Sequence, residues 1–164
     1  MKKTFNTLEV LNIVGFNNQL TEEKNAAMGI KVRWALKNAL KTLISDAQQF
    51  EEFREAELQK IRNEFFNDEK SEELTRKKLD NDGNPVLDEE GNEVEETVRQ
   101  IKNEYVDNYQ VAISKLQQEL DDILREKHEY EYKGVDINAL VETLPDDTAL
   151  TFEDVNMLDL ILGE

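Results

Sequence analysis

The chain contains a single histidine, and histidine is the side chain that most often moves a proton near neutral pH. To act as a general base, His128 would need a nucleophile or an orienting carboxylate beside it, and the neighbouring sequence offers no clear partner. A zinc-binding helix carries two histidines one turn apart, which one histidine cannot provide. We therefore expect His128 to be a cation in the last turn of a helix, where the helix dipole favours positive charge.

Adjacent carboxylates are the second group that could do chemistry, as a general acid and a general base. Such pairs need contrasting environments that separate their pKa values. In a chain with 35 % charged residues, adjacent acids are expected to lie in water instead. There is no cysteine and no glycine-rich phosphate loop. The sequence therefore predicts a protein without catalytic residues or cofactor, and the pairs considered are Glu51-Glu52, Asp121-Asp122 and Asp146-Asp147.

The segment Asp80-Asn81-Asp82-Gly83 resembles part of a calcium-binding loop. With Gly83 as the sixth loop residue, the first ligand would be Lys78, which cannot coordinate a cation. With Gly91 in that place, the loop would begin at Val86 and end at Thr97, and neither residue fits the ligand pattern. We interpret the segment as a turn and expect no metal site, although adventitious cation binding is possible among so many carboxylates.

A cationic and aromatic group gives the clearest candidate for partner binding. Trp34 stands beside Arg33, Lys37 and Lys41, and tryptophan and arginine are common at the energetic centres of interfaces. The alternative, which we favour at this point, is that Trp34 lies in the core and that these bases pair with acids near the C-terminus.

Four apolar residues are further candidates for partner binding. Phe53 and Phe66 fall off the main apolar stripe of their helix, so that they would mark a binding surface if exposed. Val86 and Leu87 lie between two predicted turns.

Charge restricts the partners. Lys and Arg number 20 against 37 Asp and Glu, which gives a net charge of −17, so that we expect no direct binding to nucleic acid or to anionic membranes. The charge is uneven, because residues 1–41 carry about +4 and the remainder about −21, with no base after Lys133. No apolar run could span a membrane. The polar residues within 8–17 predict a mature soluble N-terminus, and we expect a cytoplasmic protein.

The elements that would position these residues are mainly helices. Apolar residues at steps of three and four predict helices at 8–17, from Thr21 to about Asp68, and at about 95–128, and we expect Gly29 to mark a close helix approach. Near the C-terminus, residues 130–132 alternate like a strand, 135–140 suit a short helix, and Thr151 caps a last helix. That last helix would present Phe152, Val155, Leu158 and Ile161 or Leu162.

Between the long helices the chain repeats itself, as Asp82-Gly83-Asn84-Pro85-Val86 and Glu90-Gly91-Asn92-Glu93-Val94. Glycine after an acid or Asn tolerates the positive φ of tight turns, so that this region should reverse the chain. The predicted fold is therefore all-α in the main, a long antiparallel helical hairpin with a β-turn or β-hairpin tip. One domain, residues 1–164, would comprise a base (1–37 and 129–164), a two-helix arm (38–78 and 95–128) and a tip (79–94).

The chain resembles small phage and prophage proteins without an assigned function. The resemblance lies in the helix around residues 31–43, the turn Asp-Glu-Glu-Gly-Asn-Glu-Val at 88–94, and the ending Leu-Thr-Phe-Glu-Asp-Val-Asn-Met-Leu-Asp-Leu-Ile-Leu at 150–162. It implies a phage or prophage origin, hence a bacterial host cytoplasm, and carries over no functional residue. The helix–turn–helix plan is also similar to prefoldin-type chaperone subunits.

Three hypotheses about function follow from the sequence. In the first, the chain binds a host or phage protein through its arm or tip, as an accessory, assembly or host-takeover factor. In the second, its acidic surface mimics nucleic acid and inhibits a DNA-binding or defence protein. The third is a prefoldin-like chaperone or scaffold, and an enzyme is disfavoured. Self-association stays open, because the apolar spacing departs from strict heptads.

Overall fold

The computed structural model describes residues 1–164, and more than half of these residues are helical, as the sequence predicts. The chain forms two compact units. Unit 1 contains Met1–Arg54 and Glu119–Glu164, and unit 2 contains Glu55–Gln118. Because two long helices contribute residues to both units, the units are described one at a time.

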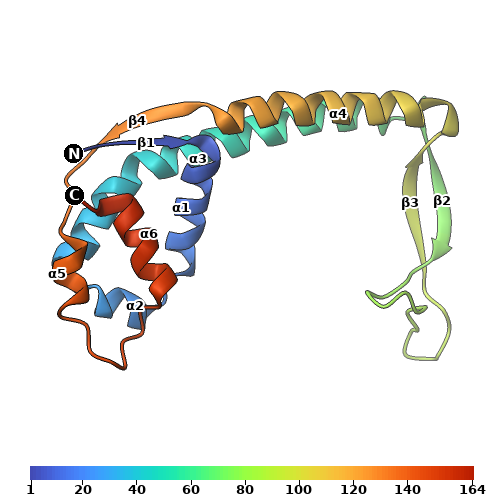
Figure 1. Ribbon diagram of the computed structural model, residues 1–164. Helices are drawn as coiled ribbons and strands as arrows, with labels where there is room; N and C mark the ends of the chain where they lie inside the picture. Colours follow the sequence, from blue (N-terminus) through green and yellow to red (C-terminus); the bar gives the residue numbers. More distant parts are fainter. The chain divides into compact units, whose positions relative to one another are not determined.

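Unit 1 is built from helices that surround the first half of α3 (Gly29–Phe65). Figure 1 shows α6 between α1 and α3, and α6 contacts both α1 and α5. Segments from the two ends of the chain therefore share one core. The other helices are α1 (Thr7–Gln19), α2 (Glu22–Ala27), α5 (Ile137–Val141) and α6 (Phe152–Leu162).

The core of unit 1 follows the apolar stripe that the sequence predicts for the long helix. Leu36, Leu40, Leu43, Ala47 and Phe50 are all buried. Their spacing of three and four residues keeps them on one face of the helix, which lies against the other elements. The core cluster contains the first four of these residues but not Phe50, and its other members are Phe5, Val10, Ile13, Met28, Val32, Ala35, Ala39, Tyr130, Ile137, Leu150, Leu158, Ile161 and Leu162.

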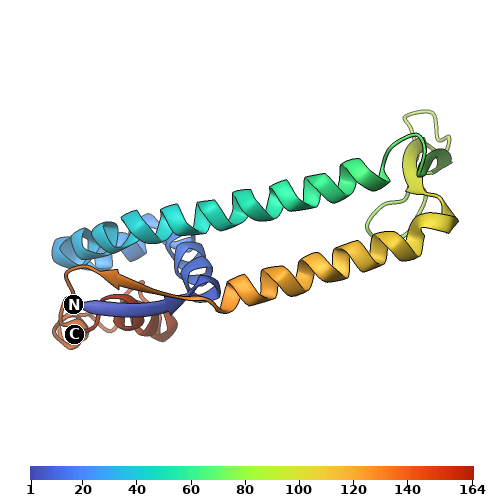
Figure 2. The ribbon, with the colours of Figure 1, turned by 90° about the horizontal axis from the view of Figure 1, so that it is seen from above.

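A two-stranded antiparallel sheet joins the N-terminal segment to the chain after α4 (Asn103–Arg125). Strand β1 (Lys2–Asn6) pairs with β4 (Lys127–Glu131), and Figure 2 shows them side by side. The predicted strand at 130–132 is confirmed in part by β4, whereas β1 was not expected. Helix α1 follows directly, and its N-cap is Asn6, whose side chain accepts from the Glu9 amide at 2.8 Å.

The predicted helix from Thr21 is interrupted. Helix α2 ends at Ala27, and Gly29 opens α3 with a φ of +70°. That backbone conformation suits glycine, which lacks the Cβ that disfavours it in other residues. The interpretation of Gly29 as a close helix approach is wrong, because an added Cβ would meet nothing within 4 Å.

The last helix, α6, begins with the predicted capping box. The Thr151 hydroxyl accepts from the Asp154 amide at 3.2 Å, and the Asp154 carboxylate accepts from the Thr151 amide at 2.8 Å. Lys24 from α2 also pairs with Asp154 at 2.8 Å. Burial by itself raises the pKa of Asp154, but the hydrogen bonds from Lys24 and Thr151 outweigh burial and hold the pKa below its usual value. Of the apolar residues that the sequence assigns to this helix, Leu158, Ile161 and Leu162 are buried, whereas Phe152 is 79 % exposed.

This depressed pKa makes the stability of unit 1 depend on pH. A carboxylate with a lowered folded pKa stabilises the fold above its unfolded pKa of about 3.9, and the contribution is lost as the pH falls through the folded pKa. Asp154→Asn should therefore lower the free energy of unfolding by about 1–2 kcal/mol at neutral pH, and the difference from wild type should shrink as the pH falls below the unfolded pKa and through the folded pKa. Urea unfolding across a pH series measures this. The exposed neighbour Glu153 provides the control, Glu153→Gln, and an Asp154→Asn deficit that is independent of pH would contradict the assignment.

Unit 2 contains the end of α3 and the start of α4, with a strand pair between them in sequence. The Phe65 and Tyr109 rings meet edge to face at 5.5 Å, so that the two helices contact one another here. Strand β2 (Ser71–Lys77) pairs with β3 (Glu95–Ile101) in antiparallel register, Ser71 opposite Ile101 and Lys77 opposite Glu95. The helix predicted at 95–128 is therefore wrong over its first seven residues, and α4 begins only at Asn103. The hairpin along the full length of both helices stays a prediction.

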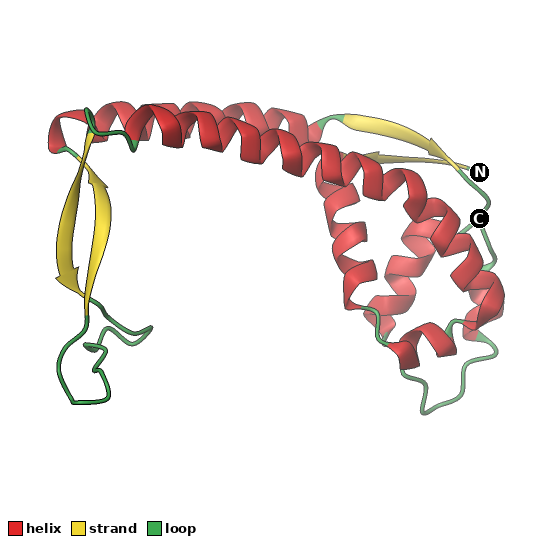
Figure 3. Cartoon of the chain, turned by 180° about the vertical axis from the view of Figure 1, so that it is seen from behind, coloured by secondary structure: helices red, strands yellow, loops and turns green.

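The repeated segment beyond the β2–β3 ladder is ordered by its own hydrogen bonds. Figure 3 shows it as turns and loops at the end of the strand pair. Asp80 and Asp88 each accept two backbone amides through Oδ1 at 2.8–2.9 Å, and Gly83 and Gly91 adopt φ values of +84° and +85°. The turn interpretation is thereby confirmed. These backbone bonds also lower the pKa of both aspartates against the smaller opposing effect of desolvation.

The repeat also closes a ring of three backbone hydrogen bonds. The amide of Lys78 donates to Val94, that of Val94 donates to Val86, and that of Val86 donates to Lys78, at 2.8–2.9 Å. Pro85 has no N–H to donate, and it lies opposite Leu79 in an isolated bridge. None of the observed hydrogen bonds at this position requires a donor from Pro85. The ring fixes where β2 ends and β3 begins, and so it sets the register of the ladder.

Candidate protein-binding surface

The exposed face of the first four turns of α3 is cationic and carries the only tryptophan. Trp34 is 64 % exposed and Ile30 is also largely exposed. The expectation that Trp34 lies in the core is wrong. Its spacing explains why, because Trp34 stands two residues before the buried Leu36, about 200° around an α-helix. The exposed bases on this part of α3 are Lys31, Arg33, Lys37 and Lys41.

Trp34 borders an apolar groove that lies within unit 1. The groove has a volume of about 870 Å³. One wall is the corner between α2 and α3, and the other is the segment 133–143, which includes α5. The buried side chains of Met28, Val32 and Ala35 contribute apolar surface from the first wall, and Val135 and Leu140 contribute it from the second. This combination of an apolar interior and a few polar groups is typical of binding sites.

The bases around the groove form no ion pairs. Lys31 and Lys133 line it, whereas Arg33, Lys37 and Lys41 line a separate hollow of about 450 Å³ that shares no lining residue with the groove. None of the five takes part in the ion pairs of the structure, which in unit 1 engage Lys2, Lys24 and Arg54. The expectation that these bases pair with C-terminal acids is therefore wrong.

One acid lines the groove, and it has a structural role. The Asp136 side chain caps α5 by accepting from the Ala139 amide at 3.2 Å. Of the lining residues, sequence reasoning identified only Trp34. The signal for Lys133 was present, because Lys133 is the last base in the chain. No pattern in the sequence predicts that segment 133–143 packs beside α3.

The other predicted candidates do not join Trp34 and Arg33 on this surface. Phe53 faces a different hollow of unit 1. Phe66 belongs to unit 2 and packs edge to face on Tyr109 at 5.8 Å. Val86 is half-buried and bonded within the tip ring, whereas Leu87 is exposed there.

The hollow beside Phe53 gathers the polar groups that most resemble a reaction centre. Tyr130 donates to Asp46 at 2.7 Å, and Thr7 Oγ1 lies 3.5 Å from His128 Nε2. Burial, then the Asp46 hydrogen bond and charge, raises the pKa of the Tyr130 hydroxyl. These are two separate pairs, and no carboxylate is seen to orient the imidazole as a catalytic triad requires. The predicted position of His128 in a last helical turn is wrong, because it lies in β4 opposite Phe5.

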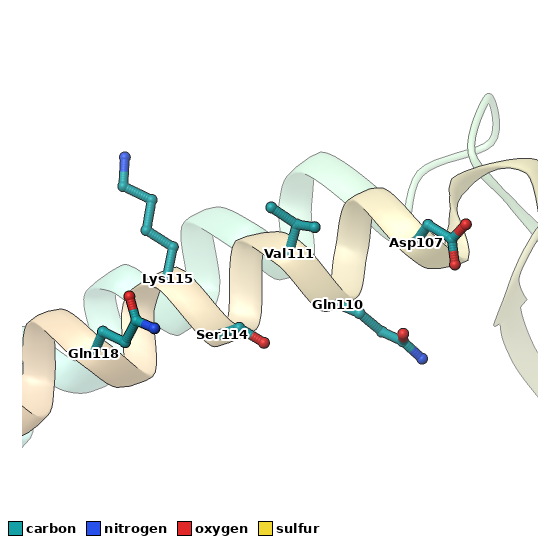
Figure 4. A pocket seen from close by; sticks show the side chains of 6 residues that line it. All are labelled: Asp107, Gln110, Val111, Ser114, Lys115 and Gln118. Atoms are coloured by element: carbon teal, nitrogen blue, oxygen red, sulfur yellow. The ribbon is translucent and has the colours of Figure 1, made fainter.

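A further hollow of about 530 Å³ lies along α4 in unit 2. Figure 4 shows its six lining side chains, all from one helix and directed away from one another rather than toward a common point. The described chain also contains no group of three or more His, Cys, Asp or Glu residues arranged to hold a metal. Neither the hollow beside Phe53 nor the hollow along α4 has reactive side chains that converge on one point. The groove beside Trp34 therefore remains the strongest candidate for a binding site.

Comparison with protein-family models, curated proteins and solved structures finds no match for this chain. No helix combines the length and apolar content that a membrane span requires.

Proposed function

We propose that this chain is a non-enzymatic protein-binding protein and that it binds its partner through the groove beside Trp34. The observation that supports the proposal is the exposed tryptophan at an apolar groove that is also lined by two lysines without ion pairs, Lys31 and Lys133. An exposed apolar patch rimmed by polar residues marks an interaction site, and tryptophan is among the residues that contribute most to interface energetics. The proposed binding surface is therefore the groove of unit 1, in place of the arm or tip that the sequence suggested.

The setting that we propose is that of a phage or prophage accessory, assembly or host-takeover factor. Its support is the resemblance described above. The partner would then be a host or phage protein. Nucleic-acid mimicry and a prefoldin-like role stay predictions, since no contact in the structure favours either of them over groove binding.

Replacing Trp34 should remove most of the binding energy. Removing an interface tryptophan commonly costs 2 kcal/mol or more, which corresponds to about 30-fold in affinity. Proteins captured from a bacterial lysate by wild type and lost with Trp34→Ala would be purified, and their affinities for both chains measured by calorimetry. Because Trp34 is exposed, Trp34→Ala should change the free energy of unfolding by no more than about 0.5 kcal/mol.

Phe152→Ala is the matched control, since Phe152 is an exposed aromatic of unit 1 that does not line the groove. It should leave the affinity within about twofold of wild type, as expected for a residue outside the interface. A purified partner that binds wild type and Trp34→Ala equally well would contradict binding through this groove. Weakened binding by Leu87→Ala in the same assay would return the interface to the tip.

A further inference from the structure

The sequence around the groove separates charge in an unusual way for so acidic a chain. Between Lys24 and Asp46 there is no acidic residue, although the whole chain carries 37. Lys31, Arg33, Lys37 and Lys41 all fall within this stretch and turn outward. A local excess of one sign raises the concentration of oppositely charged groups at that surface. The α3 wall of the groove therefore belongs to a positively charged stretch of a negative protein, whereas the second wall carries both Lys133 and the helix-capping Asp136.

We propose that the groove takes an acidic peptide segment of a partner protein, with a bulky apolar side chain seated against Trp34 and carboxylates facing Lys31 and Lys133. This inference rests on the proposed function and specifies its ligand. Charge complementarity selects the occupant, because neither lysine forms an ion pair within the chain, and Asp136, the one acid that lines the groove, caps α5 instead.

The apolar walls of the groove favour an acidic peptide over a nucleic acid as the ligand. Met28, Val32 and Leu140 offer nothing that a phosphate backbone could hydrogen-bond, and the net charge of −17 repels nucleic acid as a whole. An amphipathic peptide supplies both parts that the groove requires, apolar side chains for its walls and carboxylates for its rim. Such segments commonly dock in apolar grooves through a few anchor residues.

The only tryptophan of the chain is also a built-in reporter. Three synthetic peptides of equal length and identical apolar residues, with Glu, Gln or Lys at every polar position, would be titrated against the full chain while Trp34 fluorescence is recorded. We expect the Glu peptide to shift the emission to shorter wavelength and to bind at least about tenfold more tightly than the Gln peptide. The Lys peptide should not bind.

Charge reversal provides the decisive variant. Lys31→Glu with Lys133→Glu should weaken the Glu peptide by at least about tenfold and allow the Lys peptide to bind. The matched control is Lys3→Glu with Lys127→Glu, which changes the net charge equally on strands outside the groove. It should leave both affinities within about twofold. Circular dichroism would check that every variant is folded.

Each other outcome overturns the inference. Equal binding of all three peptides shows a purely apolar groove, and binding of a single-stranded oligonucleotide in place of the Glu peptide shows a nucleic-acid site. Self-association that Trp34→Ala abolishes, without peptide binding, shows that a second copy is the occupant. If none of the peptides binds, the acidic-segment inference fails, while the proposed function still stands wherever Trp34→Ala weakens a purified partner.

Discussion

Replacing Leu43 with alanine should lower the free energy of unfolding of unit 1 by about 2–5 kcal/mol. The Leu43 side chain is fully buried in the middle of the α3 stripe, among the residues that both ends of the chain bring to the core. The loss has two parts, the transfer free energy of the removed methyl groups and the cavity that the neighbours cannot fill. Urea unfolding followed by circular dichroism, with Trp34 fluorescence as a probe on the same helix, measures it.

Leu8→Ala is the control for this substitution. Leu8 lies in α1 of the same unit and is 49 % exposed. Alanine is the better helix former, so that the exposed substitution should change the free energy of unfolding by no more than about 0.5 kcal/mol. A Leu43→Ala protein as stable as Leu8→Ala would show that the α3 stripe does not face the core.

Ile161→Ala should destabilise unit 1 by a similar amount, about 2–5 kcal/mol. Ile161 is fully buried in α6, and its carbonyl accepts a hydrogen bond from the Tyr132 hydroxyl at 2.8 Å. Burial also raises the pKa of Tyr132 to about 12, so that this hydroxyl stays a donor at neutral pH. The substitution tests whether the C-terminal helix completes a core that begins with β1 and α1.

Leu160→Ala is the matched comparison, because Leu160 is the preceding residue and is 45 % exposed. Its substitution removes an apolar side chain of the same size from the same turn of α6. We expect Leu160→Ala to lower the free energy of unfolding by at most about a third of the Ile161→Ala effect, because a half-exposed side chain buries less apolar area on folding. Equal effects of the two substitutions would mean that α6 packs on a different face, and the groove wall formed by α5 would then need to be reassigned.

The groove depends on this core, although neither buried residue lines it. Its second wall is the segment 133–143, and α5 in that segment contacts α6. Loss of α6 packing should therefore loosen one wall of the groove, while the wall from α3 stays in place. Ile161→Ala is for this reason unsuitable as a binding control, and the exposed Phe152 serves that purpose instead.

The sequence by itself determined the features that depend on residues close to one another in the chain. Steps of three and four from Leu36 to Phe50 identified the buried face of α3, because an α-helix repeats every 3.6 residues. The capping box at Thr151 and the glycines at 83 and 91 were recognised from local chemistry alone. The outward position of Trp34 was predicted wrongly, although its offset of two residues from Leu36 places it on the opposite face of the helix.

Only the tertiary structure decided where distant segments meet. Residues 95–101 carry a helical apolar pattern, yet they form β3, because the turn repeat delivers them opposite β2, where ladder hydrogen bonds outweigh weak helix propensity. Strand β1 likewise exists only beside β4. The groove arose in the same way, from the packing of segment 133–143 against α3 about a hundred residues earlier. Periodicity and capping depend on residues within a few helical turns of one another. Which apolar faces pack together depends instead on the burial of side chains from distant parts of the chain.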